Sequence, residues 1–171
     1  MVNMDLVILG VLMGHSAHGY AIKQAIEASF GKRYVGMSNS SLYPKLNKLE
    51  ADGFIVGKRE QQEKVPDRKI FEITPAGIEH LKKLVAEPPS PRDTEFDFKS
   101  RAVFFGLITP AERRRILEPL YREKLEELEE ARQKRGQFGQ YLDKYASAVL
   151  EAGIKELALA AELYKILLDM G

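Results

Sequence analysis

The sequence predicts a mostly helical protein that has one small β-hairpin and ends in a part built of helices alone. Three observations support this fold class. Apolar residues recur at helical spacing along most of the chain, and two short strand-like runs flank a polar stretch at residues 57–69. A proline-rich segment, residues 87–91, then interrupts the helical pattern. We therefore expect a mixed domain before this segment and an all-α domain after it.

The composition excludes several classes of site. The 171 residues include no cysteine, which rules out disulfides, thiolate metal sites and cysteine nucleophiles. Hydrophobic content of 44% and charged content of 30% are ordinary for a globular protein, and a net charge of +1 does not by itself indicate a nucleic-acid partner. The apolar run from Leu6 to Met13 is too short to span a membrane and follows Asp5 rather than a basic segment. We expect a cytoplasmic protein without a membrane partner.

Two helices are predicted before residue 32. Residues 4–13 are apolar and end at Gly14, so they form a buried first helix. Residues 19–30 carry apolar side chains at i, i+4 and i+8, and Gly31 follows as a C-terminal stop.

The third helix has two faces. Ser38–Ser41 offer N-cap hydroxyls, so the helix begins near residues 39–41, and Gly53 ends it. We expect Pro44 to be tolerated because the first turn has no intrahelical use for its N–H groups. One face is an apolar stripe, made of Leu42, Leu46 and Leu49. The other is polar and carries Ser41, Tyr43, Lys45, Asn47 and Lys48.

The next elements are a hairpin and a fourth helix. Residues 54–56 and 70–73 are strand-like, and the charged stretch between them forms the tip of the hairpin. Thr74-Pro75 is a cap followed by proline at the first helical position. Three helices, a hairpin and a fourth helix are the element order of a winged helix-turn-helix. We predict this domain over residues 1–87 and a linker over 88–95.

Residues 96–171 are predicted to form an all-α domain. Residues 96–107 form a short, very apolar helix, and residues 109–112 form a capping box that contains a proline. Pro119 predicts a break or kink near residue 118. Gly136 and Gly139 are expected to interrupt the pattern before a last helix within residues 140–169.

These last helices carry more apolar surface than so small a domain can bury alone, which favours a homodimer. The residues predicted to form the dimer interface are Phe104, Phe105, Leu150, Ile154, Leu157, Ala161, Tyr164 and Leu168. Tyr141, Tyr145 and Tyr164 could also line a ligand cavity, although aromatic residues at helical spacing are more often core or interface.

The polar face of the third helix and the hairpin favour DNA binding. In a helix-turn-helix the recognition helix enters the major groove with its N-terminal residues at the base edges, and lysines and arginines of the hairpin can contact phosphates. The predicted DNA-binding residues are Ser38, Asn39, Ser40, Ser41, Tyr43, Pro44, Lys45, Lys48, Lys58, Arg59, Lys64, Arg68 and Lys69. Each of these features also has an interpretation without DNA. Serines at a helix start are mostly caps, helix lysines are mostly solvated, and winged helices also bind proteins.

Residues 4–86 resemble the PadR family of bacterial transcriptional regulators. The resemblance rests on Leu9-Gly10-Val11-Leu12, on His18-Gly19-Tyr20-Ala21-Ile22, on the run from Ser41 to Ile55 that contains Leu42-Tyr43-Pro44, and on the run from Arg68 to Gly77. Residues 92–171 are similar to the longer C-terminal domain of the branch that includes phenolic-acid-responsive repressors. Phe71 departs from the tyrosine usual at that position of the wing, so a phenolic hydrogen bond is not expected there.

The resemblance implies a homodimeric repressor that binds a palindromic double-stranded DNA operator through the third helix and the wing. It also implies a small aromatic effector as a further partner. We expect no catalytic site, no cofactor and no metal, since His15, His18 and His80 lack a nearby set of ligands. The alternative function is a winged-helix adaptor that binds proteins and not DNA.

Overall fold

The computed structural model describes residues 3–31, 38–60, 68–90 and 92–170, with the backbone alone for Asn39, Glu60 and Arg68. The chain divides into two compact units, Met1–Ile108 and Thr109–Gly171. Each unit is described by itself below.

The first unit contains the four predicted helices, and their bounds follow local caps. These helices are α1 (Met4–Gly14), α2 (Gly19–Phe30), α4 (Asn39–Ala51) and α5 (Pro75–Ala86). The caps at the start of α4 and α5 are Ser38 and Thr74, whose hydroxyls accept backbone N–H groups of the first turn. The predicted mostly helical fold is confirmed.

The core of the first unit is built from one face of each helix. Val7, Ile8 and Leu9 of α1 are fully buried, as are Ile22 and Ile26 of α2. The stripe predicted for the third helix is buried as well, with Leu42, Leu46 and Leu49 each at most 1% exposed. Burial of this stripe leaves the polar face of α4 toward solvent.

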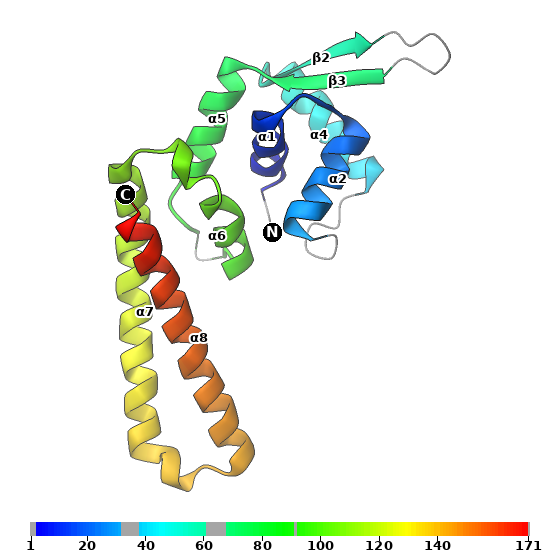
Figure 1. Cartoon of the computed structure of the whole chain (residues 1–171). Helices are drawn as coiled ribbons and strands as arrows, with labels where there is room; N and C mark the ends of the chain where they lie inside the picture. Colours follow the sequence, from blue (N-terminus) through cyan, green and yellow to red (C-terminus); the bar gives the residue numbers. More distant parts are fainter. Residues whose placement is uncertain (1–2, 32–37, 61–67, 91, 171) are drawn as a thin grey trace. The chain divides into compact units, whose positions relative to one another are not determined.

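A three-stranded antiparallel sheet accompanies these helices, and Figure 1 shows the long hairpin that forms two of its strands. Its strands are β1 (Ala17–His18), β2 (Ile55–Glu60) and β3 (Arg68–Ile73), in the spatial order β1-β3-β2. The predicted hairpin is confirmed, and its strands are longer than expected because Gly57–Glu60 pairs with Arg68–Phe71. The tip itself, residues 61–67 with Lys64, lies outside the described residues.

Strand β1 was not predicted. It has two residues, too few to show an alternating pattern, and it exists because Ala17 pairs with Phe71 across the sheet. Phe71 is 3% exposed, so this position of the wing is a core position.

Pro44 lies further along α4 than the expectation placed it. The helix begins at Asn39, so Pro44 follows the first turn and removes a hydrogen bond that Ser40 C=O would otherwise accept. Both residues are exposed, so water can reach the freed carbonyl. The predicted start of the helix near residues 39–41 is confirmed, but the reason expected for the tolerance of Pro44 was wrong, because Pro44 lies past the first turn.

The segment 96–107, expected as one helix, is α6 (Glu95–Ala102) followed by a short 3₁₀ turn, η1 (Phe105–Leu107). Both belong to the first compact unit, whereas the predicted domain division placed them in the helical domain that follows the linker. The ring of Phe98 meets that of Phe105 edge-to-face, with centroids 6.0 Å apart, and both are buried. This contact stabilises the segment within the unit.

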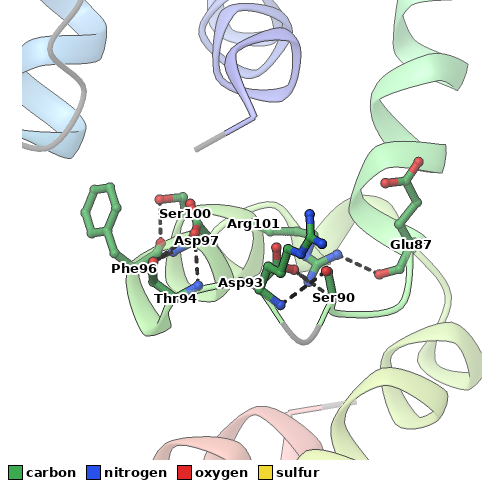
Figure 2. Close-up of polar contacts among 9 residues, drawn as sticks. Glu87, Ser90, Asp93, Thr94, Phe96, Asp97, Ser100 and Arg101 are labelled. Carbon is green, nitrogen blue, oxygen red and sulfur yellow. Dashed lines mark hydrogen bonds and ion pairs between the residues drawn. The ribbon is translucent and has the colours of Figure 1, made fainter. Parts of the chain in front are cut away.

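Arg101 joins α6 to the end of α5 (Figure 2). Its Nη1 donates to the backbone carbonyl of Glu87 at 2.7 Å, and its Nη2 lies 3.6 Å from Asp93 Oδ2. The side chain is 9% exposed. Its Nε and Nη2 are buried with no hydrogen-bond partner among the described residues.

The second unit is a helical hairpin. Helix α7 (Pro110–Phe138) and helix α8 (Lys144–Asp169) pack side by side, joined by a 3₁₀ turn, η2 (Gly139–Tyr141) (Figure 1). The predicted capping box is present, because Thr109 and Glu112 exchange hydrogen bonds between side chain and backbone.

Two expected interruptions do not end α7. Pro119 lies inside the helix and is exposed, so water can satisfy the carbonyl of the preceding turn that has lost its N–H partner. Gly136 also remains helical. Gly139 is the first residue past α7, as expected.

Candidate nucleic-acid interface

The N-terminus of α4 is held by reciprocal hydrogen bonds among serines. Ser38 Oγ accepts from Ser41 N–H at 3.2 Å, and Ser41 Oγ accepts from Ser38 N–H at 3.1 Å. The hydroxyls of Ser38 and Ser40 lie 2.7 Å apart. Ser38 and Ser41 therefore have a capping role that accounts for their residue type, and all three serines remain exposed at the helix start.

Tyr43 lies beside the start of α2. A Cβ added to Gly19 would be 3.0 Å from Cε1 and 3.1 Å from the hydroxyl oxygen of Tyr43, so the ring rests directly on the glycine. The side chain of Tyr43 is nevertheless 46% exposed. Gly19 thus holds a polar aromatic group at the surface next to the cap of α4.

An open groove of about 720 Å³ runs along this surface. It is lined by His18, Gly19, Tyr20, Ala21, Gln24, Tyr43, Asn47, Lys69 and Phe71, which come from α2, α4 and the sheet. Tyr43 and Lys69 were among the predicted DNA-binding residues, and the groove brings them together.

Tyr20 and Gln24 lie in the same groove but were not predicted. Gln24 Nε2 donates to the Tyr20 hydroxyl at 3.2 Å, and Tyr20 is 58% exposed. The only feature of the sequence that could have predicted the role of Tyr20 is a tyrosine in the first turn of a predicted helix. Its position beside Tyr43 depends on how α2 and α4 pack.

The described lysines of the predicted DNA-binding set are all ion-paired within the first unit. Lys45 Nζ lies 2.9 Å from Asp5 Oδ1, and Lys48 Nζ lies 2.8 Å from Asp52 Oδ2. The other two pairs are Lys58 with Glu72 at 2.6 Å and Lys69 with Glu50 at 2.5 Å. The surface formed by α4 and the wing is therefore closer to electrically neutral than its lysine content indicates.

Glu50 is the most constrained of these carboxylates. Its hydrogen bond from Lys69 is the main cause of a pKa below the ordinary value of 4.5, and a hydrogen bond from Gly57 N–H lowers the pKa of Glu50 further against the opposing effect of burial. Lys69 Nζ also lies 5.3 Å from the centroid of the Phe71 ring. Glu50 therefore links α4 to both strands of the wing.

Arg59 differs from the lysines, because it is exposed and forms no ion pair with any described residue. It pairs with Lys69 across the β2–β3 ladder. The backbone of Arg68 lies in β3 opposite Glu60.

The residues predicted for the dimer interface fall in two places. Phe105 is buried within the first unit, and the ring of Phe104 lies over Gly10 of α1. Leu150, Ile154, Leu157 and Leu168 are half-buried and Ala161 and Tyr164 are buried in the α7–α8 hairpin. Packing within the chain thus accounts for their apolar character, and their part in a dimer stays a prediction.

A second apolar row lies exposed on α8. Its members are Tyr145, Val149, Leu159 and Ile166, together with Met170 at the C-cap, each between 51% and 76% exposed. Their separations of four, seven and ten residues place them on one helix face. The predicted stripe is offset from this row and lies on a separate face, so α8 is apolar on two sides.

The three tyrosines considered for a ligand cavity are not equivalent. Tyr141 and Tyr145 are 76% and 72% exposed, whereas Tyr164 is 6% exposed. Among the residues described, no group of three His, Asp or Glu side chains could hold a metal ion. None of the helices searched combines the length and apolar character that a membrane span requires.

Comparisons with known proteins find similarity to transcriptional regulators. A model of the transcriptional regulator PadR-like family matches residues 8–83. The negative transcriptional regulator PadR of Bacillus subtilis is 27% identical over 106 residues, which cover 61% of this chain and 58% of that protein, less than two thirds of its length.

Solved structures of similar proteins include a transcriptional regulator from Clostridium thermocellum, 30% identical over 47% of this chain and 77% of that one, with a TM-score of 0.44. Bacillus subtilis PadR in complex with operator DNA is 20% identical over 98% of both chains, with a TM-score of 0.47.

Proposed function

We propose that this chain, whose residues 8–83 belong to the PadR-like family of transcriptional regulators, represses transcription by binding operator DNA as a homodimer. The observation that carries the proposal is the exposed polar surface of α4. It presents the serines at the start of the helix, Tyr43 and Asn47 beside a groove that is also lined by Lys69. Hydroxyls, a phenol and an amide on a rigid helix are suited to base-edge and phosphate contacts.

The mechanism places the N-terminal turns of α4 in the major groove and the wing against the phosphate backbone. Of the predicted DNA-binding residues, Ser40 and Tyr43, which are exposed in the first turns of α4, then lie nearest to the bases. Arg59 contacts a phosphate without first leaving a described carboxylate. Repression follows from occupying a promoter, in line with the negative regulation attributed to the B. subtilis relative.

A two-fold dimer would set the spacing of two α4 helices on a palindromic operator, about one helical turn apart. The exposed row on α8 supports the dimer, because a second copy would remove these side chains from water. Replacing Leu159 with Glu should convert the dimer to a monomer in sedimentation experiments. Lys165→Glu, a charge change on another part of α8, should not.

A small aromatic effector would release the DNA by binding one dimer geometry more tightly than the other. Bacillus subtilis PadR has been solved in complex with p-coumaric acid, so phenolic acids are the first compounds to add to a DNA-binding assay. Loss of the shifted band with one of them, and not with benzoate at equal concentration, would support this part of the proposal.

The DNA-binding proposal is tested by a mobility-shift assay on the promoter region of the chain's own gene, with random-sequence competitor. Asn47→Ala should weaken the specific complex roughly tenfold, the scale of one lost base or phosphate contact. A wild-type protein that shifts neither promoter nor random DNA would contradict the proposal and favour the adaptor function.

A further inference from the structure

Glu50 lies at the junction of α4 and the wing, and its two carboxylate oxygens have different partners. Oε1 accepts a hydrogen bond from Gly57 N–H at 3.1 Å, and Oε2 accepts one from Lys69 Nζ at 2.5 Å. The side chain of Glu50 is 29% exposed and that of Lys69 is 41% exposed. The carboxylate is therefore held by the fold, and the ammonium group is its more accessible partner.

Lys69 is also the cationic residue that lines the groove beside Tyr43 and Asn47. A phosphate that approaches this groove meets an ammonium group already paired with an internal carboxylate. The charge available for the phosphate is thus lower than the presence of Lys69 alone indicates.

We propose that Glu50 is a specificity-determining residue for DNA binding, which lowers affinity for DNA of any sequence by neutralising Lys69 at the groove. The inference rests on the proposed DNA-binding function. It assigns to Glu50 an effect on discrimination between operator and other DNA that requires no contact between Glu50 and a base.

The physical reason is the exchange of ions. A free lysine that contacts a phosphate displaces cations condensed on the DNA, and this sequence-independent gain makes up almost all of non-specific binding. While Lys69 stays paired with Glu50, its ammonium group does not contact a phosphate, and no condensed cation is displaced from the DNA at this position. Non-specific binding depends almost wholly on this release, so it loses a larger share of its free energy than specific binding, which also has base contacts.

The other described pairs act in the same direction, but Glu50 allows the sharpest test. In Glu50→Gln the amide oxygen can still accept the Gly57 N–H, so the link to β2 is kept and only the charge is removed. Glu79 of α5 offers a matched control, because it pairs with Lys82 at 2.8 Å and Lys82 is outside the predicted DNA-binding set.

The experiment measures binding of the full-length protein to a random-sequence duplex by fluorescence anisotropy over a range of salt concentrations. Glu50→Gln should bind roughly eightfold more tightly at 0.1 M salt, and the slope of log K against log salt should steepen by about 0.9 for each Lys69 that contacts a phosphate. Glu79→Gln makes the same change in net charge and should leave the slope at the wild-type value. Glu50→Gln/Lys69→Gln should return the slope to that value.

An unchanged slope in Glu50→Gln would overturn the inference, as would an equal change in Glu79→Gln, which would reduce the effect to net charge. Should Glu50→Gln fail to fold by circular dichroism, Lys69→Gln decides. If Glu50 neutralises Lys69 in the wild type, the Lys69→Gln variant should have nearly the wild-type slope. If Lys69 is free to contact a phosphate in the wild type, the variant's slope should be shallower by about 0.9. A wild type that binds no DNA refutes the proposed function and the inference with it, whereas DNA binding with unchanged slopes refutes the inference alone.

Discussion

The ring of Tyr43 in α4 rests on the backbone of Gly19 at the start of α2, and a methyl group at Gly19 would come within 3.1 Å of three ring and hydroxyl atoms. The glycine therefore determines where the phenol lies. Because the contact joins two helices of the first unit, it connects their packing with the surface proposed to bind DNA.

Gly19→Ala should displace Tyr43 by a few tenths of an ångström and weaken operator binding several-fold. The free energy of unfolding should change by less than about 1 kcal/mol, because an exposed ring can move. Anisotropy titration and urea denaturation measure the two effects. Gly14→Ala is the control, since its new methyl group would meet nothing within 4 Å. Equal affinities of the two variants would show that the position of Tyr43 is irrelevant to binding.

Ser38→Ala removes the oxygen that accepts Ser41 N–H at the start of α4. The loss of this cap should lower the free energy of unfolding by about 1 kcal/mol. DNA affinity should fall as well, because the first turn of the recognition helix frays. Hydrogen exchange of the α4 amides locates the effect. Ser38→Asp should restore protection, and failure to do so would count against capping as the cause.

Gly10→Ala places a methyl group on α1 where it would overlap the present position of Phe104 Cζ. Crowding of this kind costs about 1–3 kcal/mol, while alanine in place of glycine gains about 1 kcal/mol in a helix. The variant should therefore be destabilised in the wild-type background.

The same substitution should be stabilising in a Phe104→Leu background, where the crowding is removed. Chemical denaturation of all four proteins gives this coupling directly. Additive effects would mean that the ring of Phe104 does not lie over Gly10.

Arg101→Met should cost less stability than Arg101→Ala. The methionine keeps most of the buried volume and removes two nitrogens that lack hydrogen-bond partners, but it also removes the Nη1 donor to the Glu87 carbonyl, so we expect a cost of about 1 kcal/mol. The alanine leaves a cavity and should cost about 2–4 kcal/mol. Thermal unfolding of the two variants compares them. A methionine variant as unstable as the alanine one would mean that the charge, and not the volume, holds α6 in place.

Glu112 should make α7 sensitive to acid. Hydrogen bonds from the backbone and hydroxyl of Thr109 hold the pKa of Glu112 below its ordinary value of 4.5. Since its pKa is lower in the folded state, its contribution is fully present above pH 4.5 and is lost as the pH falls through the folded-state pKa. When helicity is followed by circular dichroism from pH 7 to 3, it should decline at a lower pH in Glu112→Gln than in the wild type. Identical acid transitions would assign the loss to other carboxylates.

Much of the first unit follows from short-range signals. Helix α2 ends at Gly31, whose φ of 82° favours glycine, and Ser38 and Thr74 cap the helices after them. The stripe of Leu42, Leu46 and Leu49 predicted which side of α4 is buried, and therefore which side can contact a partner. These features are local, since a cap or a helical period involves residues no more than a turn apart.

The sequence by itself therefore determined the helices of the winged unit, its hairpin and the polar face of α4. Only the tertiary structure decided the pairing of Ala17 with Phe71, the contact of Tyr43 with Gly19 and the link from Lys69 to Glu50, which is 19 residues away in the chain. It also decided that α8 is apolar on two sides, one of which packs in the hairpin. The physical reason is that such contacts depend on how separate elements pack, and no spacing within one element records which charge or ring its neighbour will present.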